Sequence, residues 1–336
     1  MTIGQLKSGG ESPPSAEDSG ERFPKNLHAP PQSTWVSRFL GRFYFTGPFW
    51  YQIHLWGVQS WRRPLLPVWV GVFSVFFFVV LGRVRRNLMA NLSVILGPAG
   101  LLRSWGRAYH AIRDWAWCRS EKYERFEWGE DDFTFVIEGQ EHWDAASSGE
   151  RGLIVLSTHL GNFESGTFLP KHLLDRTIHL VREPELDPKA QAWMDRLKEK
   201  KVGGVDIVTH IEIGDDFQRG LELLGALRRG DIVAVTADRP RSGGRVVRAE
   251  LFGRPFPIPE GPAILARTAE VPMILLSVIR EGRRRYRVVL RPPIVVERTA
   301  DRQADIERAV RQMASDVEHV IARAPTQWFC FQRVFD

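Results

Sequence analysis

The spacing of hydrophobic positions predicts alternating strands and helices over the second two-thirds of this chain. Short apolar runs rich in β-branched residues are typical of buried strands. They occur at Phe133–Ile137, Leu153–Leu156, Thr177–Val181, Val205–Val208, Ile232–Val235, Met273–Val278 and Tyr286–Leu290. Helical spacing separates them at Ala190–Lys200, Phe217–Arg229 and Pro262–Ala269. This alternation predicts an α/β fold.

Two further helices are predicted at the ends of this region. Ser104–Glu124 has large apolar residues at helical spacing, and Ile306, Val310, Met313, Val317 and Val320 lie on one face of a last helix. We expect that face to pack against the sheet. No repeat of fixed period appears, and the glycines do not follow a dinucleotide or phosphate-loop pattern.

The N-terminal third has a different composition. Residues 1–33 are rich in Pro, Gly, Ser, Glu and Lys, which predicts a disordered polar tail without a cleavable signal peptide. The charge-free stretch Pro64–Gly82 follows, flanked by arginines and preceded by many aromatic residues; as a helix it would be roughly 28 Å long, about one hydrocarbon core. We predict a membrane-associated helical segment over 34–100, spanning or half-inserted, and a catalytic domain over 101–336. A buried core helix is the alternative reading of Pro64–Gly82.

The net charge and the absence of known motifs indicate which kinds of molecule the protein binds. The net charge is +6, which favours anionic partners, and the absence of a nucleic-acid-binding motif favours a membrane surface over nucleic acid. The basic cluster Arg280, Arg283, Arg284, Arg285 and Arg287 has two readings: a solvated strand edge, or a docking site for an acidic carrier protein or lipid phosphates. Cys118 and Cys330 are too far apart in sequence to suggest a disulfide framework, which fits a reducing compartment.

The candidate chemistry is concentrated after the strand Leu153–Leu156. There the sequence Ser157-Thr158-His159-Leu160-Gly161-Asn162-Phe163-Glu164 places an imidazole and a carboxylate five positions apart. On one continuous helix these side chains would point roughly 140° apart. A sharp turn at Gly161 and Asn162 would let Glu164 accept a proton from one nitrogen of His159 and leave the other nitrogen as a base. The alternative is that His159 is a structural histidine of the loop and that Glu164 only complements the positive end of a helix.

These residues resemble the His-x-x-x-x-Asp/Glu acyltransferases, and within them the bacterial lipid A biosynthesis (lauroyl/myristoyl) acyltransferases. The resemblance runs from about Arg85–Leu88 to the C-terminus and includes several blocks in the same order. These are Val136–Gly139 with Gly152–Ser157, Leu180–Pro184, Gly230–Pro240, Leu251–Pro255, Gly261–Ala266 and Pro325–Phe329. Cys330, where an aromatic residue is more usual, and the polar extension before Trp35 depart from the family pattern.

The resemblance implies a fold, a reaction and a set of site residues. The fold would be a glycerolipid-acyltransferase-like mixed sheet flanked by helices, with an N-terminal membrane-anchoring helical segment. The protein would be located at the inner membrane, with its catalytic domain facing the cytoplasm. His159 and Glu164 would be catalytic. The residues matched to substrate binding are Arg182, Asp238, Arg239, Phe252 and Gly253, with Asp238 expected to hold an arginine in place.

The implied reaction is direct transfer of an acyl chain from a thioester to a hydroxyl of a lipid, most simply a lipid A precursor. An acidic acyl carrier protein or coenzyme A would carry the donor chain, and no cofactor or metal is expected. A lysophospholipid or another glycolipid is the alternative acceptor. A metal-dependent hydrolase and an inactive scaffold are more distant alternatives; the scattered histidines speak against the first, and the intact His159 and Glu164 against the second.

Overall fold

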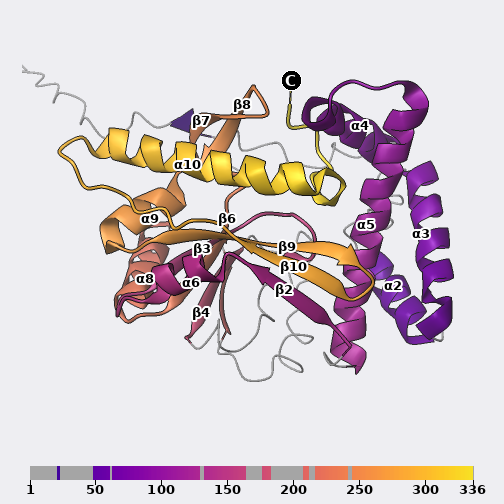
Figure 1. Cartoon of the computed structure of the whole chain (residues 1–336), viewed down its shortest axis with the longest axis horizontal. Coiled ribbons are helices and arrows are strands. Elements are labelled where there is room, and N and C mark those ends of the chain that lie inside the picture. Colours follow the sequence, from indigo (N-terminus) through magenta and orange to yellow (C-terminus); the bar gives the residue numbers. More distant parts are fainter. Residues whose placement is uncertain are drawn as a thin grey trace, which may run out of the picture.

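A mixed, mostly parallel sheet forms the centre of the protein (Figure 1). The computed structural model describes residues 21–22, 48–60, 63–128, 132–163, 176–182, 207–211, 216–240 and 244–335. The strands of the sheet lie in the order β2-β10-β9-β3-β6-β4-β5, and every pair is parallel except β9 with β10. Their bounds are Thr134–Glu138 (β2), Leu153–Ser157 (β3), Ile178–Arg182 (β4), Ile207–Ile211 (β5), Ile232–Thr236 (β6), Met273–Gly282 (β9) and Arg285–Leu290 (β10). The predicted α/β fold with a mixed sheet is confirmed.

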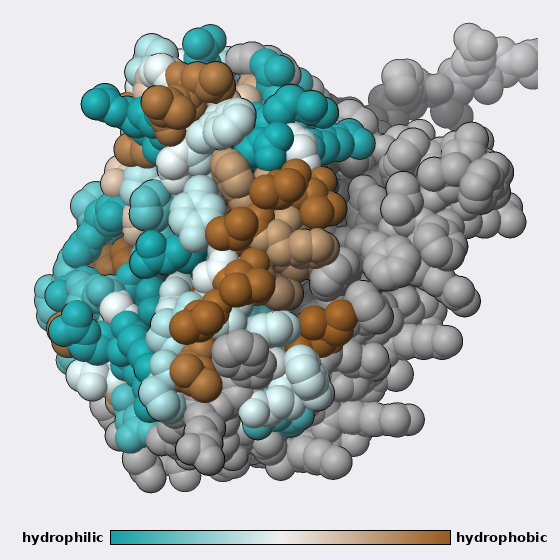
Figure 2. Space-filling model, turned by 90° about the vertical axis from the view of Figure 1, so that its right-hand side faces the viewer, coloured by the Kyte–Doolittle hydropathy of each residue, from teal (hydrophilic) through white to brown (hydrophobic). Residues whose placement is uncertain are grey.

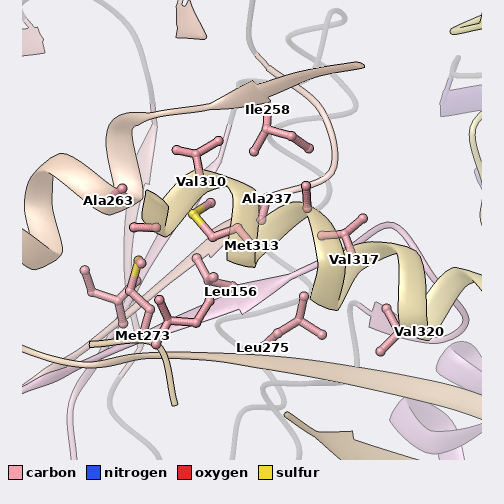
Figure 3. Packing of buried hydrophobic residues seen from close by; sticks show 14 of the residues in the cluster. Leu156, Ala237, Ile258, Ala263, Met273, Leu275, Val310, Met313, Val317 and Val320 are labelled. Atoms are coloured by element: carbon pink, nitrogen blue, oxygen red, sulfur yellow. The ribbon is translucent and has the colours of Figure 1, made fainter. Parts of the chain in front are cut away.

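Helices cover both faces of this sheet. The long helix α10 (Arg302–Arg323) and α9 (Gly261–Ala269) lie on one face, with α8 (Asp216–Arg228) beside them, and α6 (Gln140–Ser147) packs on the other. Asp301 caps the start of helix α10, since its side chain accepts a hydrogen bond from the amide of Ala304. Figure 3 shows how its apolar face, with Val310, Met313 and Val317, meets Leu156 and Leu275 of the sheet. This is the packing that the spacing predicted.

A small second sheet lies above α10 in the view of Figure 1. This sheet was not predicted. It consists of β7 (Arg245–Leu251), β8 (Arg254–Pro259) and a two-residue strand β1 (Glu21–Arg22) that pairs with β7. Apart from β1, the predicted tail over 1–33 lies outside the described residues, as does the predicted helix Ala190–Lys200. The strand predicted at Val205–Val208 is observed two residues later, as β5.

A layer of four helices flanks the sheet on one side (Figure 1). They are α2 (Pro48–Ser60), α3 (Leu66–Val80), α4 (Gly82–Leu96) and α5 (Leu101–Trp128), and they share a core of their own. The apolar stretch Pro64–Gly82, predicted as one helix, forms the shorter helix α3, which ends at Val80, and α4 then leaves it at 92°. Among the described residues no single helix is long and apolar enough to cross a bilayer, although this bent pair together passes the same test.

Candidate active site

His159 lies on a tight loop that leaves the middle of the main sheet. Strand β3 runs between β9 and β6, and the chain turns directly after it at Gly161, where φ is +57°. A Cβ atom at Gly161 would lie 2.1 Å from the carbonyl oxygen of Val278, so only glycine fits this turn. The amide of Gly161 donates to Gln327, and that of Phe329 donates to the carbonyl of His159, both at 2.9 Å. The predicted sharp turn is therefore present, held by β9 and by the C-terminal segment.

Asp238 binds the imidazole of His159. It follows β6, the strand next to β3, and the ends of adjacent parallel strands bring the two residues together. Its Oδ1 atom lies 2.8 Å from Nδ1 of His159, and its Oδ2 atom accepts the main-chain amide of the same residue at 3.1 Å. Asp238 is completely buried, whereas about a quarter of the His159 side chain is exposed, at 24%. The imidazole of His159 is thus held by a buried carboxylate, while part of its side chain stays accessible to solvent.

The electrostatics of this pair determine which nitrogen is free. Burial by itself would raise the pKa of Asp238, but the contacts with His159, the charge of Arg239 and the indole of Trp328 together hold that pKa below its usual value. Trp328 Nε1 donates to Oδ2 at 2.8 Å. An ionised carboxylate can only accept, so Nδ1 carries the proton that it shares with Asp238. In the neutral imidazole, Nε2 then has no proton, which is the arrangement that a general base needs.

Arg239 brings a positive charge to the same place. Its Nε atom lies 3.3 Å from Nδ1 of His159 and 4.0 Å from Oδ2 of Asp238. The expectation for Asp238 was that it holds an arginine; its closest contacts are instead with His159 and Trp328. Trp328 belongs to the closing block Pro325–Phe329, but the sequence contains no signal that its indole would reach a carboxylate after β6.

The other candidate residues are not gathered at His159 in the described part of the chain. Glu164 lies outside the described residues, and Arg182 is the last residue of β4, with a side chain that is also outside them. Phe252 and Gly253 form the turn between β7 and β8, both with positive φ, and the amide of Phe252 donates to Glu318 of α10. No described contact joins that turn to the histidine.

The comparisons with known proteins bear on this site. The sequence profile described as "Bacterial lipid A biosynthesis acyltransferase" matches residues 102–336, more than half of the chain. The chain belongs to this family. The resemblance drawn from the motifs is thereby confirmed, and an acyltransferase acting on lipids is the activity that the family indicates. No curated protein sequence matches the chain.

A crystal structure of the 1-acyl-sn-glycerophosphate acyltransferase PlsC from Thermotoga maritima also matches. It shares 13% identity with this chain, covers 81% of it and 97% of its own length, and has a TM-score of 0.34. At that level of similarity it supports no further conclusion about the site.

A cleft lies beside the histidine, between the loop and helix α5. It is lined by Trp115, Cys118, Arg119, Gly161–Phe163 and Phe329. The ring of Phe163 lies 4.9 Å from the imidazole of His159, centroid to centroid, so the cleft and the imidazole are adjacent. Burial raises the pKa of the Cys118 thiol, with Glu121 adding to the effect, so this side chain is an unreactive part of the wall.

The predicted basic cluster lies on β9, on β10 and on the turn that joins them. Most of its members bind carboxylates: Arg280 to Glu121, Arg283 and Arg284 to Glu124, and Arg287 to Glu281. These arginines therefore fasten the hairpin to helix α5 and to itself. Among the residues that the structure describes, no group of three His, Cys, Asp or Glu side chains is arranged to hold a metal ion.

Proposed function

We propose that this protein transfers a fatty acyl chain from a thioester donor to a hydroxyl group of a membrane lipid. The observation that carries the proposal is the contact between Asp238 and Nδ1 of His159, which leaves Nε2 of a partly exposed imidazole free. A base of this kind suits removal of a proton from a hydroxyl. Family membership supplies the class of reaction, and the site supplies a group that can start it.

The proposed reaction is a direct transfer. Nε2 of His159 takes the proton of the acceptor hydroxyl as its oxygen attacks the thioester carbonyl, and the C–O bond forms. The tetrahedral intermediate then collapses, the C–S bond breaks, and the imidazolium returns its proton to the leaving thiolate. The negative charge of Asp238 stabilises the imidazolium while it exists.

Three further residues complete this proposal. Arg239, close to both members of the pair, is suited to stabilise negative charge on the reacting oxygen or on an acceptor phosphate, and Arg182 is proposed for the same task. Glu164 remains a proposed catalytic carboxylate. Since Asp238 already occupies Nδ1 in the described structure, the variants Asp238→Asn and Glu164→Gln separate the two candidates.

We propose a membrane surface as the place of reaction, with helix α3 lying in the interface. Its outward face is apolar, and Figure 2 shows brown side chains running across this side of the molecule. The exposed members are Val68, Val72, Val75, Phe76, Val79 and Val80, with Leu101 and Leu102 at the start of α5. The exposed arginines Arg83, Arg86 and Arg103 are close in sequence to these apolar groups. A basic and apolar face fits an anionic bilayer, and the cytoplasmic face of the inner membrane is the proposed location.

A lipid A precursor is the acceptor we propose first, with a lysophospholipid or another glycolipid as the alternative. The donor is proposed to be an acyl chain on an acidic carrier protein or on coenzyme A. Mass spectrometry of membrane lipids from cells with the wild-type chain, with the His159→Ala variant and without the protein tests this directly. We expect one lipid to lack one acyl chain in the last two samples. Unchanged lipids in all three would contradict the proposal.

The purified enzyme tests the remaining alternatives. Activity with an acyl carrier protein thioester and with acyl-coenzyme A, measured side by side, identifies the donor. A metal-dependent hydrolase would lose activity in a chelator and would release free fatty acid, whereas transfer through His159 continues and releases none. A scaffold would show turnover with neither donor.

A further inference from the structure

Beneath the catalytic loop lies a chain of buried polar side chains that the reaction does not use directly. It begins at Glu121, in the last third of helix α5, and continues through Tyr286 of β10 to Asn162, three residues after His159. All three are buried, Glu121 completely. Burying a carboxylate costs stability unless it is well paired, so Glu121 needs several partners.

Glu121 is bound from several directions. Arg280 donates to both of its oxygens at 3.0 Å, and the main-chain amide of Arg284 donates to it at the same distance. The hydroxyl of Tyr286 donates a hydrogen bond to Oε2. The carboxylate is thus fixed by two strands at once and forms a rigid base for Tyr286.

Tyr286 connects Glu121 to the catalytic loop. Burial raises the pKa of its hydroxyl, and Glu121 adds to the effect, so the group stays protonated and donates to Glu121. Its oxygen is then available as an acceptor, and Nδ2 of Asn162 donates to it at 3.1 Å. The direction of each hydrogen bond follows from the chemistry of the three groups.

Asn162 is in turn connected to the base. Its main-chain amide donates to Val278 at 2.9 Å, and the next residue is Phe163, whose ring packs against the imidazole of His159. A shift of Asn162 would therefore move Phe163, one side of the cleft, and with it the orientation of the imidazole. A displacement of about 1 Å at a reacting group can lower a rate by about a hundredfold.

We infer that Glu121 and Tyr286 are positioning residues, which hold the catalytic loop through Asn162 and so orient His159 from helix α5. The inference rests on the proposed function for its rate measurements, but not for its measurement of loop order. It assigns a task to helix α5 beyond packing: the helix that shares a core with α3 also sets the position of the base.

The test compares matched variants of the full chain in detergent or on vesicles. Tyr286→Phe removes one hydroxyl from β10 and keeps the ion pair of Glu121 with Arg280. Its control is Tyr109→Phe, which removes a hydroxyl from helix α5. Glu121→Gln has Glu124→Gln as its control, since Glu124 is also buried on α5 and paired with arginines, but reaches the hairpin and not the loop.

We expect kcat to fall about tenfold or more in Tyr286→Phe and Glu121→Gln with KM within about twofold, and both controls to stay within about twofold of wild type in kcat. In the Asn162→Ala background, Tyr286→Phe should lower kcat no further, because its effect passes through that side chain. Equal kcat in Tyr286→Phe and Tyr109→Phe, or fully additive losses in the double variant, would overturn the inference.

Hydrogen exchange of the segment 157–163 gives a second readout that needs no turnover. It should be faster in Tyr286→Phe than in the wild-type chain and unchanged in Tyr109→Phe; equal exchange in all three would overturn the inference. If Glu121→Gln does not fold, Tyr286→Phe decides the matter alone. A wild-type chain without acyl transfer would refute the proposed function, and the exchange measurement would still decide whether Tyr286 orders the loop.

Discussion

Asp238 shows how one buried carboxylate can be kept charged and useful. It has no solvent contact, which disfavours its ionised form, yet the imidazole and main-chain amide of His159 and the indole of Trp328 surround its oxygens. Such charge-assisted hydrogen bonds are stronger than neutral ones. The residue therefore fixes the tautomer of the proposed base and provides a countercharge for its protonated form.

Replacing Asp238 by Asn should abolish most of the activity. An amide leaves the imidazolium without a countercharge and can stabilise the wrong tautomer, so we expect kcat to fall by about 10²- to 10⁴-fold with little change in KM. Steady-state kinetics with the best donor would measure this. Asp231→Asn is the matched control, because Asp231 binds His179 at 3.0 Å and precedes β6 at the strand's opposite end. A similar kcat in both variants would contradict a special role for Asp238.

Gly161 should not tolerate a side chain. Because φ is +57° and a Cβ atom would lie 2.1 Å from the Val278 oxygen, alanine would both strain the backbone and push the loop away from β9. We expect Gly161→Ala to lose activity and about 1–3 kcal/mol of unfolding free energy in urea titration. Gly220→Ala in helix α8 meets no atom within 4 Å and should gain about 0.5–1 kcal/mol. A Gly161→Ala chain with wild-type activity would exclude the turn as a requirement.

At the level of elements, the sequence was most informative where local pattern and packing agree. The strand at Leu153–Leu156 and the helix through Met313 follow directly from apolar spacing, and both were predicted. Strand β8 was missed because Pro255, Pro257 and Pro259 interrupt any strand pattern; prolines are tolerated there because β8 is an edge strand bonded on one side only.

The partner of His159 could not be read from the sequence for a different reason. Asp238 is distant along the chain, and it meets the histidine only because β6 is the neighbour of β3 in the sheet. Strand order depends on how the whole sheet assembles and leaves no mark in local spacing. The connection from Glu121 to the loop was missed for the same reason, since it joins a helix, a late strand and the loop.

Helices α2 and α5 are joined by a histidine that should make the fold sensitive to acid. His54 is buried, its Nε2 atom lies 2.8 Å from Oγ of Ser120, and its ring packs on Phe73. Burial, aided by the charge of Arg119, lowers its pKa from 6.5 to about 3. Between these values the unfolded chain binds a proton that the folded chain does not, so stability falls as the pH decreases below 6.5.

Urea unfolding at pH 7.5 and pH 5 would measure this contribution. We expect His54 to account for a loss of about 2 kcal/mol at pH 5, from about 1.4 kcal/mol for each pH unit below its unfolded pKa. His54→Gln should remove that part of the difference between the two pH values, while His142→Gln, at a partly exposed position of α6, should not. Identical pH dependence in wild type and His54→Gln would show that this histidine is not the sensor.

At the scale of the whole molecule, helix α5 belongs to two structures. It packs with α3 and α4 in the core of the helical layer, and its carboxylates bind the hairpin of β9 and β10. The predicted division at residue 101 therefore runs between elements that share one core. Attachment of the helical layer to a bilayer would therefore also orient the sheet next to His159, because α5 binds both.

The outward face of α3 should determine attachment to membranes. Val72, Val75 and Val79 are each more than half exposed, so replacing all three by Gln should cost little folding stability. Full burial of a valine is worth about 1.5 kcal/mol, and partial insertion of three should make binding at least about tenfold tighter than in the triple variant. Sedimentation with vesicles of mixed anionic and zwitterionic phospholipid would measure the bound fraction.

A second triple variant separates this face from apolar exposure in general. Val136, Leu221 and Val295 are also exposed but lie on the sheet side of the molecule, on β2, on α8 and after β10. Their replacement by Gln should leave vesicle binding unchanged, because these three positions lie away from the face proposed to meet the bilayer. Higher salt should weaken the binding of the wild-type chain, since Arg83 and Arg86 would contact anionic headgroups. If the two triple variants bind equally well, the bilayer is held by another part of the chain, and α3 is an ordinary surface helix.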